Sequence, residues 1–237
     1  MDTTDIDWTA TSAEIIDWSD TEAHGNSINM DSTNVTTSKN GQFGQALSFN
    51  GTDEYIDIGP GVNDTLDGTV AFWVKSTLDS AQTVWSIGMQ ASSSNKETIY
   101  IGNGVTGSLT NELVTVAKVN ESGDNWMAGY TTSTRSELFD GAWHHVVVVF
   151  NGGLTLPSIY LDGSLKTTSI TDVAPPDYDY GYAGADNSTI GAVKYSGTVG
   201  GYLNGSLDEF RIYNRSLSAA EVTALYNLTA QKVRISN

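Results

Sequence analysis

Short runs in which apolar or β-branched residues alternate with polar ones recur along most of this chain. Successive side chains of a strand point to opposite faces of a sheet, so this alternation predicts strands with one buried face. Turn-forming Gly, Asn, Asp and Ser residues separate many of the runs. The expected strands are 46–49, 54–58, 69–76, 83–89, 97–102, 112–119, 143–150, 158–166, 188–193 and 207–213. Their number and spacing are typical of an all-β sandwich.

Two local patterns indicate how these strands pair. Asp162-Gly163 interrupts the run 158–166, and both residues tolerate positive φ, so they predict a tight turn between two antiparallel strands. Residues 146–150 are apolar at every position, which favours a central strand with both faces covered by a loop or a ligand-facing layer. We therefore expect an antiparallel sandwich of two sheets.

One helix is expected, towards the C-terminal end. Ser218 and Glu221 have the spacing of a capping box, in which each side chain bonds the backbone N–H of the other residue. Val222, Leu225 and Tyr226 then fall on one face of a helix. This pattern predicts a short helix that packs on the sandwich.

Length and composition favour one domain over 1–237. Sandwiches of 237 residues fold as single units, and no linker-like segment or internal repeat divides the chain. The absence of cysteine excludes thiolate metal sites and thiol nucleophiles. No apolar run approaches the ~20 residues that span a bilayer, so we expect no membrane insertion.

The charge balance narrows the range of partners. The chain has 28 acidic and 11 basic residues, for a formal net charge of -17. Phosphate backbones and anionic lipid headgroups usually require a basic patch, so neither nucleic acid nor an anionic membrane is expected as a partner. An acidic surface instead favours solubility and cation binding.

The setting is expected to be extracellular. Eight Asn-x-Ser/Thr sequons favour this, at Asn34, Asn50, Asn63, Asn120, Asn187, Asn204, Asn214 and Asn227. The polar start of the chain is typical of a domain taken from a longer protein. We therefore expect one module of a larger secreted, cell-surface or virion-associated protein.

Three blocks of sequence resemble the laminin-G-like jelly roll of the concanavalin A-like lectin/glucanase superfamily. They are FGQALSFNGTDEYIDIG (43–59), DGAWHHVVVVFNG (140–152) followed by IYLDGSL (159–165), and GSLDEFRIYNRSLSAAEVTALY (205–226). The resemblance implies an all-β, two-sheet antiparallel jelly roll with one short C-terminal helix. Because this superfamily includes lectin-like modules, receptor-binding domains, hydrolases and lyases, activity has to be argued from the site.

The same resemblance implies a structural Ca²⁺. Asp208 matches the family's carboxylate ligand, and the resemblance implies further backbone carbonyl ligands from the N-terminal strand and from the turn 41–44, including Gly44. The segment 15–29 also resembles a family segment and adds Asp17 and Asn26 to the expected ligands. Carboxylate and carbonyl oxygens are the ligands that Ca²⁺ prefers. The alternative is that Asp17 and Asp208 accept backbone hydrogen bonds without a metal.

Patterns of catalytic residues are weak. His144 and His145 are adjacent, so they point to opposite faces of a strand and cannot chelate together. The paired carboxylates of related glucanases, in the pattern E-x-D-x-x-E, do not occur. RSEL (135–138) resembles a motif of alginate lyases that share this fold, but their companion motifs are missing. We expect no catalytic activity.

Two segments are candidates for sugar binding, which needs aromatic faces together with amides and carboxylates. The first is PPDYDYGYAGADN (175–187), with Tyr178, Asp179, Tyr180 and Tyr182; the alternative is a loop that packs on itself. The second would combine Trp126 and Tyr130 with Asn111, Glu112 and Arg135.

These observations predict a non-catalytic module that binds a glycan or polysaccharide and holds a structural Ca²⁺. The alternative is an assembly domain that recognises a surface protein, in which case the aromatic patches are buried against the partner. A polysaccharide lyase is the third hypothesis.

Overall fold

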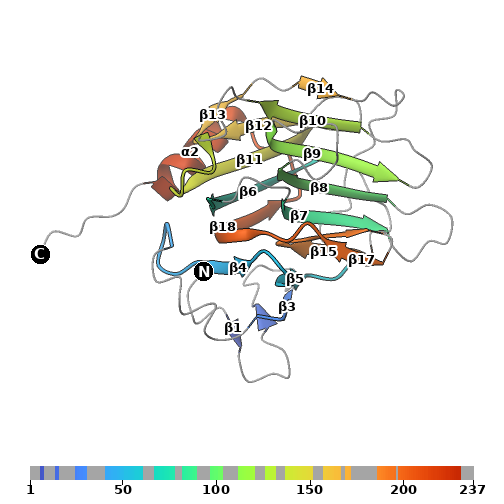
Figure 1. Cartoon of the computed structure of the whole chain (residues 1–237). Helices are drawn as coiled ribbons and strands as arrows, with labels where there is room; N and C mark the ends of the chain where they lie inside the picture. The colour runs from blue at the N-terminus through green and yellow to red at the C-terminus, as the bar shows by residue number, and fades with distance from the viewer. Residues whose placement is uncertain are drawn as a thin grey trace, which may run out of the picture.

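The computed structural model describes residues 6–7, 14–15, 25–30, 41–60, 67–77, 82–89, 97–103, 112–120, 126–131, 137–151, 157–166, 169–171, 186–195 and 197–230. Within these residues two antiparallel sheets face each other, and a helix lies against the outer side of one of them (Figure 1). The expected all-β jelly-roll sandwich is confirmed.

The larger sheet has ten strands, in the order β1-β2-β3-β5-β15-β7-β8-β9-β10-β14. In that order the strands are Ile6–Asp7, Glu14–Ile15, Gly25–Ile28, Tyr55–Asp57, Asn187–Ile190, Gln82–Met89, Glu97–Asn103, Glu112–Asn120, Trp126–Thr131 and Ser169–Thr171.

The smaller sheet has six strands, in the order β13-β12-β11-β6-β18-β4. These are Ser164–Leu165, Ser158–Leu161, His144–Asn151, Asp67–Lys75, Asn204–Tyr213 and Leu47–Asn50. A separate hairpin consists of β16 (Val193–Tyr195) and β17 (Thr198–Gly200), and the helix α2 is Ala219–Ala230. Every run expected to form a strand contains one, whereas β1, β2, β3, β10, β14 and β17 lie outside those runs.

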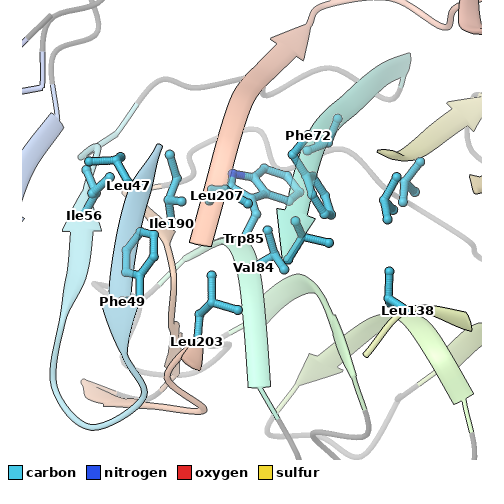
Figure 2. Packing of buried hydrophobic residues seen from close by; sticks show 14 of the residues in the cluster. Leu47, Phe49, Ile56, Phe72, Val84, Trp85, Leu138, Ile190, Leu203 and Leu207 are labelled. Carbon is cyan, nitrogen blue, oxygen red and sulfur yellow. The ribbon is translucent and has the colours of Figure 1, made fainter. Parts of the chain in front are cut away.

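The main core lies between the two sheets. Alternate side chains of β6, β11 and β18 point inward and meet side chains of β5, β7 and β15. Figure 2 shows this packing, with side chains from both sheets pointing toward one another, among them Leu47, Phe49, Ile56, Phe72, Trp85, Ile190 and Leu207.

A second apolar layer covers the outer face of the six-stranded sheet. Val147 and Val149 of β11 point into it, whereas Val146, Val148 and Phe150 point into the main core. The outer residues pack under α2, against Leu217, Val222 and Leu225. The expectation of a central strand with two covered faces is therefore confirmed, and the second cover is the helix (Figure 1).

The local signals for the helix and the hairpin are also confirmed. Ser218 N donates to Glu221 Oε2 at 2.8 Å, and Glu221 N donates to Ser218 Oγ at 3.3 Å, which is the expected capping box. Asp162 and Gly163 have φ of 50° and 74°, and they connect β12 to β13.

The adjacent histidines of β11 have opposite environments. His144 is half-buried, 2.9 Å from Asp162 Oδ2 through Nδ1 and 3.2 Å from Asp140 Oδ1 through Nε2. The hydrogen bond with Asp162 raises the pKa of His144.

His145 is buried beside Trp73 and Tyr226, with ring centroids at 5.1 and 5.8 Å. Its Nδ1 has no hydrogen-bond partner within the described part of the chain. Because burial removes water from the charged form, the pKa of His145 falls to about 4.

Gly191, which directly follows β15, packs closely against the core. Its φ is 83°, and a Cβ there would lie 2.5 Å from Cε1 of buried Phe49. Left-handed backbone costs an L-residue roughly 1–2 kcal/mol, and forcing a methyl group into a packed core adds about 1–3 kcal/mol. We expect Gly191→Ala to lower the free energy of unfolding by the sum of both costs, measured by urea denaturation.

Gly197→Ala is the matched control for this variant. Gly197 has a similar φ of 74°, but a Cβ there meets nothing within 4 Å. Only the backbone cost should remain. Equal losses of stability in the two variants would contradict the packing of Gly191 against Phe49.

The two histidines predict opposite contributions to stability as a function of pH. The folded-state pKa of His145 is about 4, below its ordinary 6.5, so only the unfolded chain binds this proton between those values. Stability should therefore fall as the pH falls through that window, by up to about 3 kcal/mol at 1.36 kcal/mol per unit. The raised pKa of His144 has the reverse effect: its contribution is present at low pH and is lost as the pH rises through the folded value.

Urea denaturation between about pH 4.5 and pH 8 measures both contributions. His145→Phe keeps an aromatic ring beside Trp73 and removes the titrating group, so its stability should fall less on acidification than that of the wild type. His144→Gln, which removes the opposing contribution, should make the fall steeper. An unchanged pH dependence in His145→Phe would show that His145 does not titrate in this way.

Candidate functional site

One row of polar side chains crosses the outer face of the ten-stranded sheet. Ile56 of β5 and Ile190 of β15 are buried in the main core, so their neighbours along each strand point away from it. The strand register then aligns one residue from each of β3, β5, β15 and β7 on that outer face: Asn26, Asp57, Thr189 and Ser86.

The hairpin β16–β17 packs on this face, over β7, β8 and β15. A chain of hydrogen bonds attaches it. Lys194 N donates to Ser86 Oγ at 3.4 Å, Ser86 Oγ and Thr189 Oγ1 are 2.7 Å apart, and Thr189 Oγ1 donates to Ala192 O at 2.8 Å. Since Thr189 donates to Ala192, Ser86 is the donor to Thr189. The hydroxyl groups therefore fix the hairpin to the sheet.

Five residues at the edge of this hairpin form what we call the outer-face cluster: Asn26, Tyr55, Asp57, Lys194 and Tyr202. The rings of Tyr55 and Tyr202 have centroids 6.3 Å apart and are tilted by 46°. Lys194 Nζ lies 3.8 Å from Asp57 Oδ2, and Asp57 Oδ1 accepts a hydrogen bond from Gly59 N at 2.9 Å. Backbone and ion-pair contacts thus hold the carboxylate on the same strand face as Tyr55, whose ring lies against that of Tyr202.

The outer-face cluster remains accessible to solvent. The side chains of Asp57 and Lys194 are 30% and 28% exposed, and Asn26 is exposed. Burial, and then the charge of Asp57, raise the pKa of Tyr55, so its phenol remains a proton donor at neutral pH. The cluster therefore offers two aromatic surfaces, a carboxylate and an amide to a polar ligand.

Asp208, the expected carboxylate ligand of a metal, lies on the outer face of the other sheet. It is 1% exposed and pairs in register with Trp73. Oδ2 accepts a hydrogen bond from Phe43 N, and Oδ1 accepts one from Glu209 N, each at 2.8 Å. The expected alternative, acceptance of backbone hydrogen bonds, is therefore present at Asp208.

The surroundings of Asp208 suit a hard cation in one respect. A Cβ on Gly41 would lie 2.8 Å from Asp208 Oδ2 and 3.0 Å from Phe43 O, so a carboxylate and a carbonyl oxygen converge on that point. Across the ranges that the structure describes, no group of three or more His, Cys, Asp or Glu is arranged to hold a metal. Further ligands would have to be backbone carbonyls or residues outside those ranges.

The expected metal ligands are only partly brought together. Gly44 lies in the turn that contacts Asp208, with φ of 59°. Asn26 lies instead on β3, next to Asp57, so it and Asp208 are on the outward faces of different sheets and do not share a site. Asp17 lies outside the described residues.

Six of the expected sugar-binding residues lie outside the residues that the structure describes. They are Tyr178, Asp179, Tyr180, Tyr182, Asn111 and Arg135. The backbones of Glu112 and Trp126 are described: Glu112 pairs with Thr131, and Trp126 pairs with Lys118. Six residues of β9 separate these two pairs, about 20 Å at ~3.3 Å per residue, so Glu112 and Trp126 lie at opposite ends of the strand pair.

The lyase-like motif RSEL does not lie on a central strand where the structure describes it. Glu137 is exposed, and Leu138 is buried in the main core, in the turn that precedes β11. This placement matches the ordinary turn of the laminin-G-like pattern. It gives no support to a substrate-binding strand at this motif.

Four members of the outer-face cluster, all except Asn26, were not expected from the sequence. The positions of Tyr55 and Asp57 could have been predicted from the sequence, because the two residues flank Ile56 in an alternating run. If Ile56 points into the core, both neighbours point to the outer face of the sheet. Lys194 and Tyr202 carried no comparable signal, since their position depends on how the hairpin β16–β17 folds over the sheet.

Comparisons with solved structures identify proteins of similar fold. Domain 4 of AbnA, a GH43 extracellular arabinanase from Geobacillus stearothermophilus in complex with arabinotriose, is 20% identical, covers 85% of this chain and 81% of its own, and has a TM-score of 0.55. Botulinum neurotoxin type C, which depends on interaction with two ganglioside molecules to enter cells, is 13% identical, with 78% and 42% coverage and a TM-score of 0.50. The CBM40 of Ruminococcus gnavus IT-sialidase is 20% identical, with 69% and 84% coverage and a TM-score of 0.48.

Identities this low show a shared fold alone. No curated protein matches the chain. In the part of the chain that is described, no helix is long and apolar enough to span a membrane. The family model of the concanavalin A-like lectin/glucanases superfamily matches residues 50–223, and the chain therefore belongs to that superfamily.

Proposed function

We propose that this chain is a non-catalytic carbohydrate-binding module and that the outer-face cluster is its sugar-binding surface. The observation that carries the proposal is the pair of rings of Tyr55 and Tyr202, 6.3 Å apart, beside the partly exposed carboxylate of Asp57. Sugars present C–H faces that pack on aromatic rings and hydroxyl groups that bond carboxylates and amides.

The rigidity of the cluster supports this role. Asn26 and Asp57 are carried on paired strands, and hydroxyl groups fix the hairpin that carries Lys194. A binding surface that is already ordered loses little conformational entropy when the ligand binds. The cluster is therefore suited to recognise a flexible oligosaccharide.

Two features support binding without catalysis. Glycoside hydrolysis needs two carboxyl groups on either side of the scissile bond. Among the described side chains of the outer-face cluster, Asp57 is the single carboxylate, and it accepts a hydrogen bond from Gly59 N and is paired with Lys194. This arrangement provides a hydrogen-bond acceptor without an acid–base pair.

The similar domains are consistent with this proposal. The arabinanase domain is described in complex with arabinotriose, and the neurotoxin is described as interacting with gangliosides. By analogy we place this module in an extracellular setting, as part of a larger secreted or surface protein. Because these domains share only the fold with this chain, the proposal of sugar binding depends on the residues of the outer-face cluster.

We also propose that a Ca²⁺ ion stabilises the module at Asp208. Asp208 would supply the carboxylate ligand, and the turn 41–44 would supply carbonyl oxygens, including that of Phe43. When bound, the ion would neutralise a carboxylate that is 1% exposed and would join the turn to β18. Its role would be structural, since Asp208 and the outer-face cluster lie on different sheets.

The first prediction concerns the ring of Tyr202. Tyr202→Ala removes one of the two aromatic surfaces, so we expect oligosaccharide affinity to fall about tenfold or more, equivalent to ~1.4 kcal/mol. Tyr202→Phe keeps the ring and loses only the hydrogen bond from Tyr202 Oη to Val199 O, so it should bind nearly as the wild type does. A neutral-oligosaccharide array followed by isothermal titration calorimetry measures both variants.

Asp57 provides the second arm of this experiment. Asp57→Asn should weaken binding, whereas Asp53→Asn makes the same change of charge in the exposed loop before β5, outside the cluster, and should not. Equal effects of these two variants, or unchanged binding by Tyr202→Ala, would show that the outer-face cluster is not the sugar-binding surface.

The calcium proposal predicts metal-dependent stability. Ca²⁺ at about 100 times its Kd should stabilise the wild type by ~2.7 kcal/mol relative to an EDTA-treated sample, which corresponds to a rise in Tm of about 5–10 °C for a domain of this size. Asp208→Asn retains one acceptor oxygen for a backbone N–H but loses the charge, so its Tm should not respond to Ca²⁺.

Asp53→Asn is the control for the calcium melts, and its Tm should respond to Ca²⁺ as that of the wild type does. Identical melts of the wild type in EDTA and in Ca²⁺ would exclude the metal. A response that persists in Asp208→Asn would place the metal elsewhere.

A further inference from the structure

We infer that the outer-face cluster selects neutral glycans and rejects sugars that carry a carboxylate, such as uronates and sialic acids. This inference rests on the proposed function and specifies the substrate class of the same site. It follows from the charges on the outer face of the ten-stranded sheet.

A site for an acidic sugar needs a cation that is available to pair with the ligand's carboxylate. Lys194 is the basic side chain of the outer-face cluster, and it already lies 3.8 Å from Asp57 Oδ2. A ligand carboxylate at Lys194 would therefore come close to the carboxylate of Asp57. Bringing two like charges together in a partly buried site is unfavourable.

The other described basic side chains lie on the opposite side of the sandwich. Lys75 and Arg211 belong to strands of the six-stranded sheet, Lys166 follows β13, and Arg215 precedes α2. Arg211 is paired with Glu209, and Arg215 with Glu221. Lys118 belongs to β9 of the ten-stranded sheet, where it pairs with Ile99, and Ile99 pairs with Ile87 of the main core, so its register position is on the inward face. Among the basic residues whose side chains the structure describes, the outer face of the ten-stranded sheet therefore has Lys194 and no second cation.

Acidic residues flank the cluster instead. Asp53 precedes β5, which carries Tyr55 and Asp57, and Asp186 precedes β15, which pairs with β5. The whole chain adds a formal net charge of -17. At low ionic strength, where the screening length reaches ~30 Å, this field opposes the approach of any anionic ligand.

The polar groups of the cluster match hydroxyl groups well. Asp57 accepts hydrogen bonds, the phenol of Tyr55 remains protonated, and the exposed amide of Asn26 both donates and accepts. A sugar hydroxyl can do both in return, and it brings no charge that must be neutralised. Neutral sugars therefore satisfy this face, and a carboxylate leaves a charge uncompensated.

The test compares matched neutral and acidic oligosaccharides on one array. Suitable pairs are lactose with 3′-sialyllactose, and a neutral galactose trisaccharide with its galacturonate counterpart; arabinotriose is added as a further neutral probe. Binding is then measured by calorimetry at about 20 mM and about 500 mM NaCl, since salt screens the repulsion of the acidic partner.

We expect at least one neutral probe to bind and its acidic partner to bind at least about tenfold more weakly in low salt. The difference should shrink in high salt. An acidic sugar that binds as tightly as its neutral partner in low salt would overturn the inference and leave the proposed function standing. If no probe binds, the proposed function fails, and the inference fails with it.

Discussion

The six-stranded sheet is apolar on both faces, and the rest of the structure depends on the need to cover them. In β11, Val146 and Val148 point to one side, whereas Val147 and Val149 point to the other. The ten-stranded sheet covers the first side, and α2 covers the second (Figure 1). Burying both faces removes a large apolar area from water, which is the dominant favourable contribution to folding.

This arrangement assigns different chemistry to the two outer surfaces of the sandwich. The outer surface of the six-stranded sheet is occupied by the helix and by the turn that contacts Asp208, and the buried carboxylate of Asp208 accepts hydrogen bonds from backbone N–H groups there. The ten-stranded sheet needs only one apolar face along β5 and β15, where Ile56 and Ile190 enter the core. Its other face carries polar side chains that are held on paired strands, and this outer face is where a ligand can bind.

Features encoded within a few residues were predictable from sequence. The all-apolar run 146–150, the Ser218 and Glu221 capping pair and the Asp162-Gly163 turn each depend on local conformation and on local hydrophobic pattern. All three are present in the structure. That a helix covers the outer face of β11 could not be predicted from the local sequence, because it depends on where α2 packs.

The candidate site was predictable only in part, because it joins segments that are distant in sequence. Alternation about Ile56 places Tyr55 and Asp57 on one face, but nothing near them indicates that Tyr202 packs against Tyr55. Asn26 shows the opposite problem: a resemblance in sequence grouped it with Asp208, whereas strand pairing places it beside Asp57. Sheet membership is set by long-range pairing, which a local pattern does not contain.

For a chain with a formal net charge of -17, a ligand is best recognised through hydrogen bonds that do not depend on its charge. Lys194 and Asp57 are close enough to offset each other, although a pair about 30% exposed contributes little to stability. In the proposed site the pair would instead affect selectivity, since Lys194, the basic side chain described on that face, already lies beside Asp57. Hydroxyl groups suit that face because they can both donate and accept, so a ligand gains hydrogen bonds there without working against the field of the whole molecule.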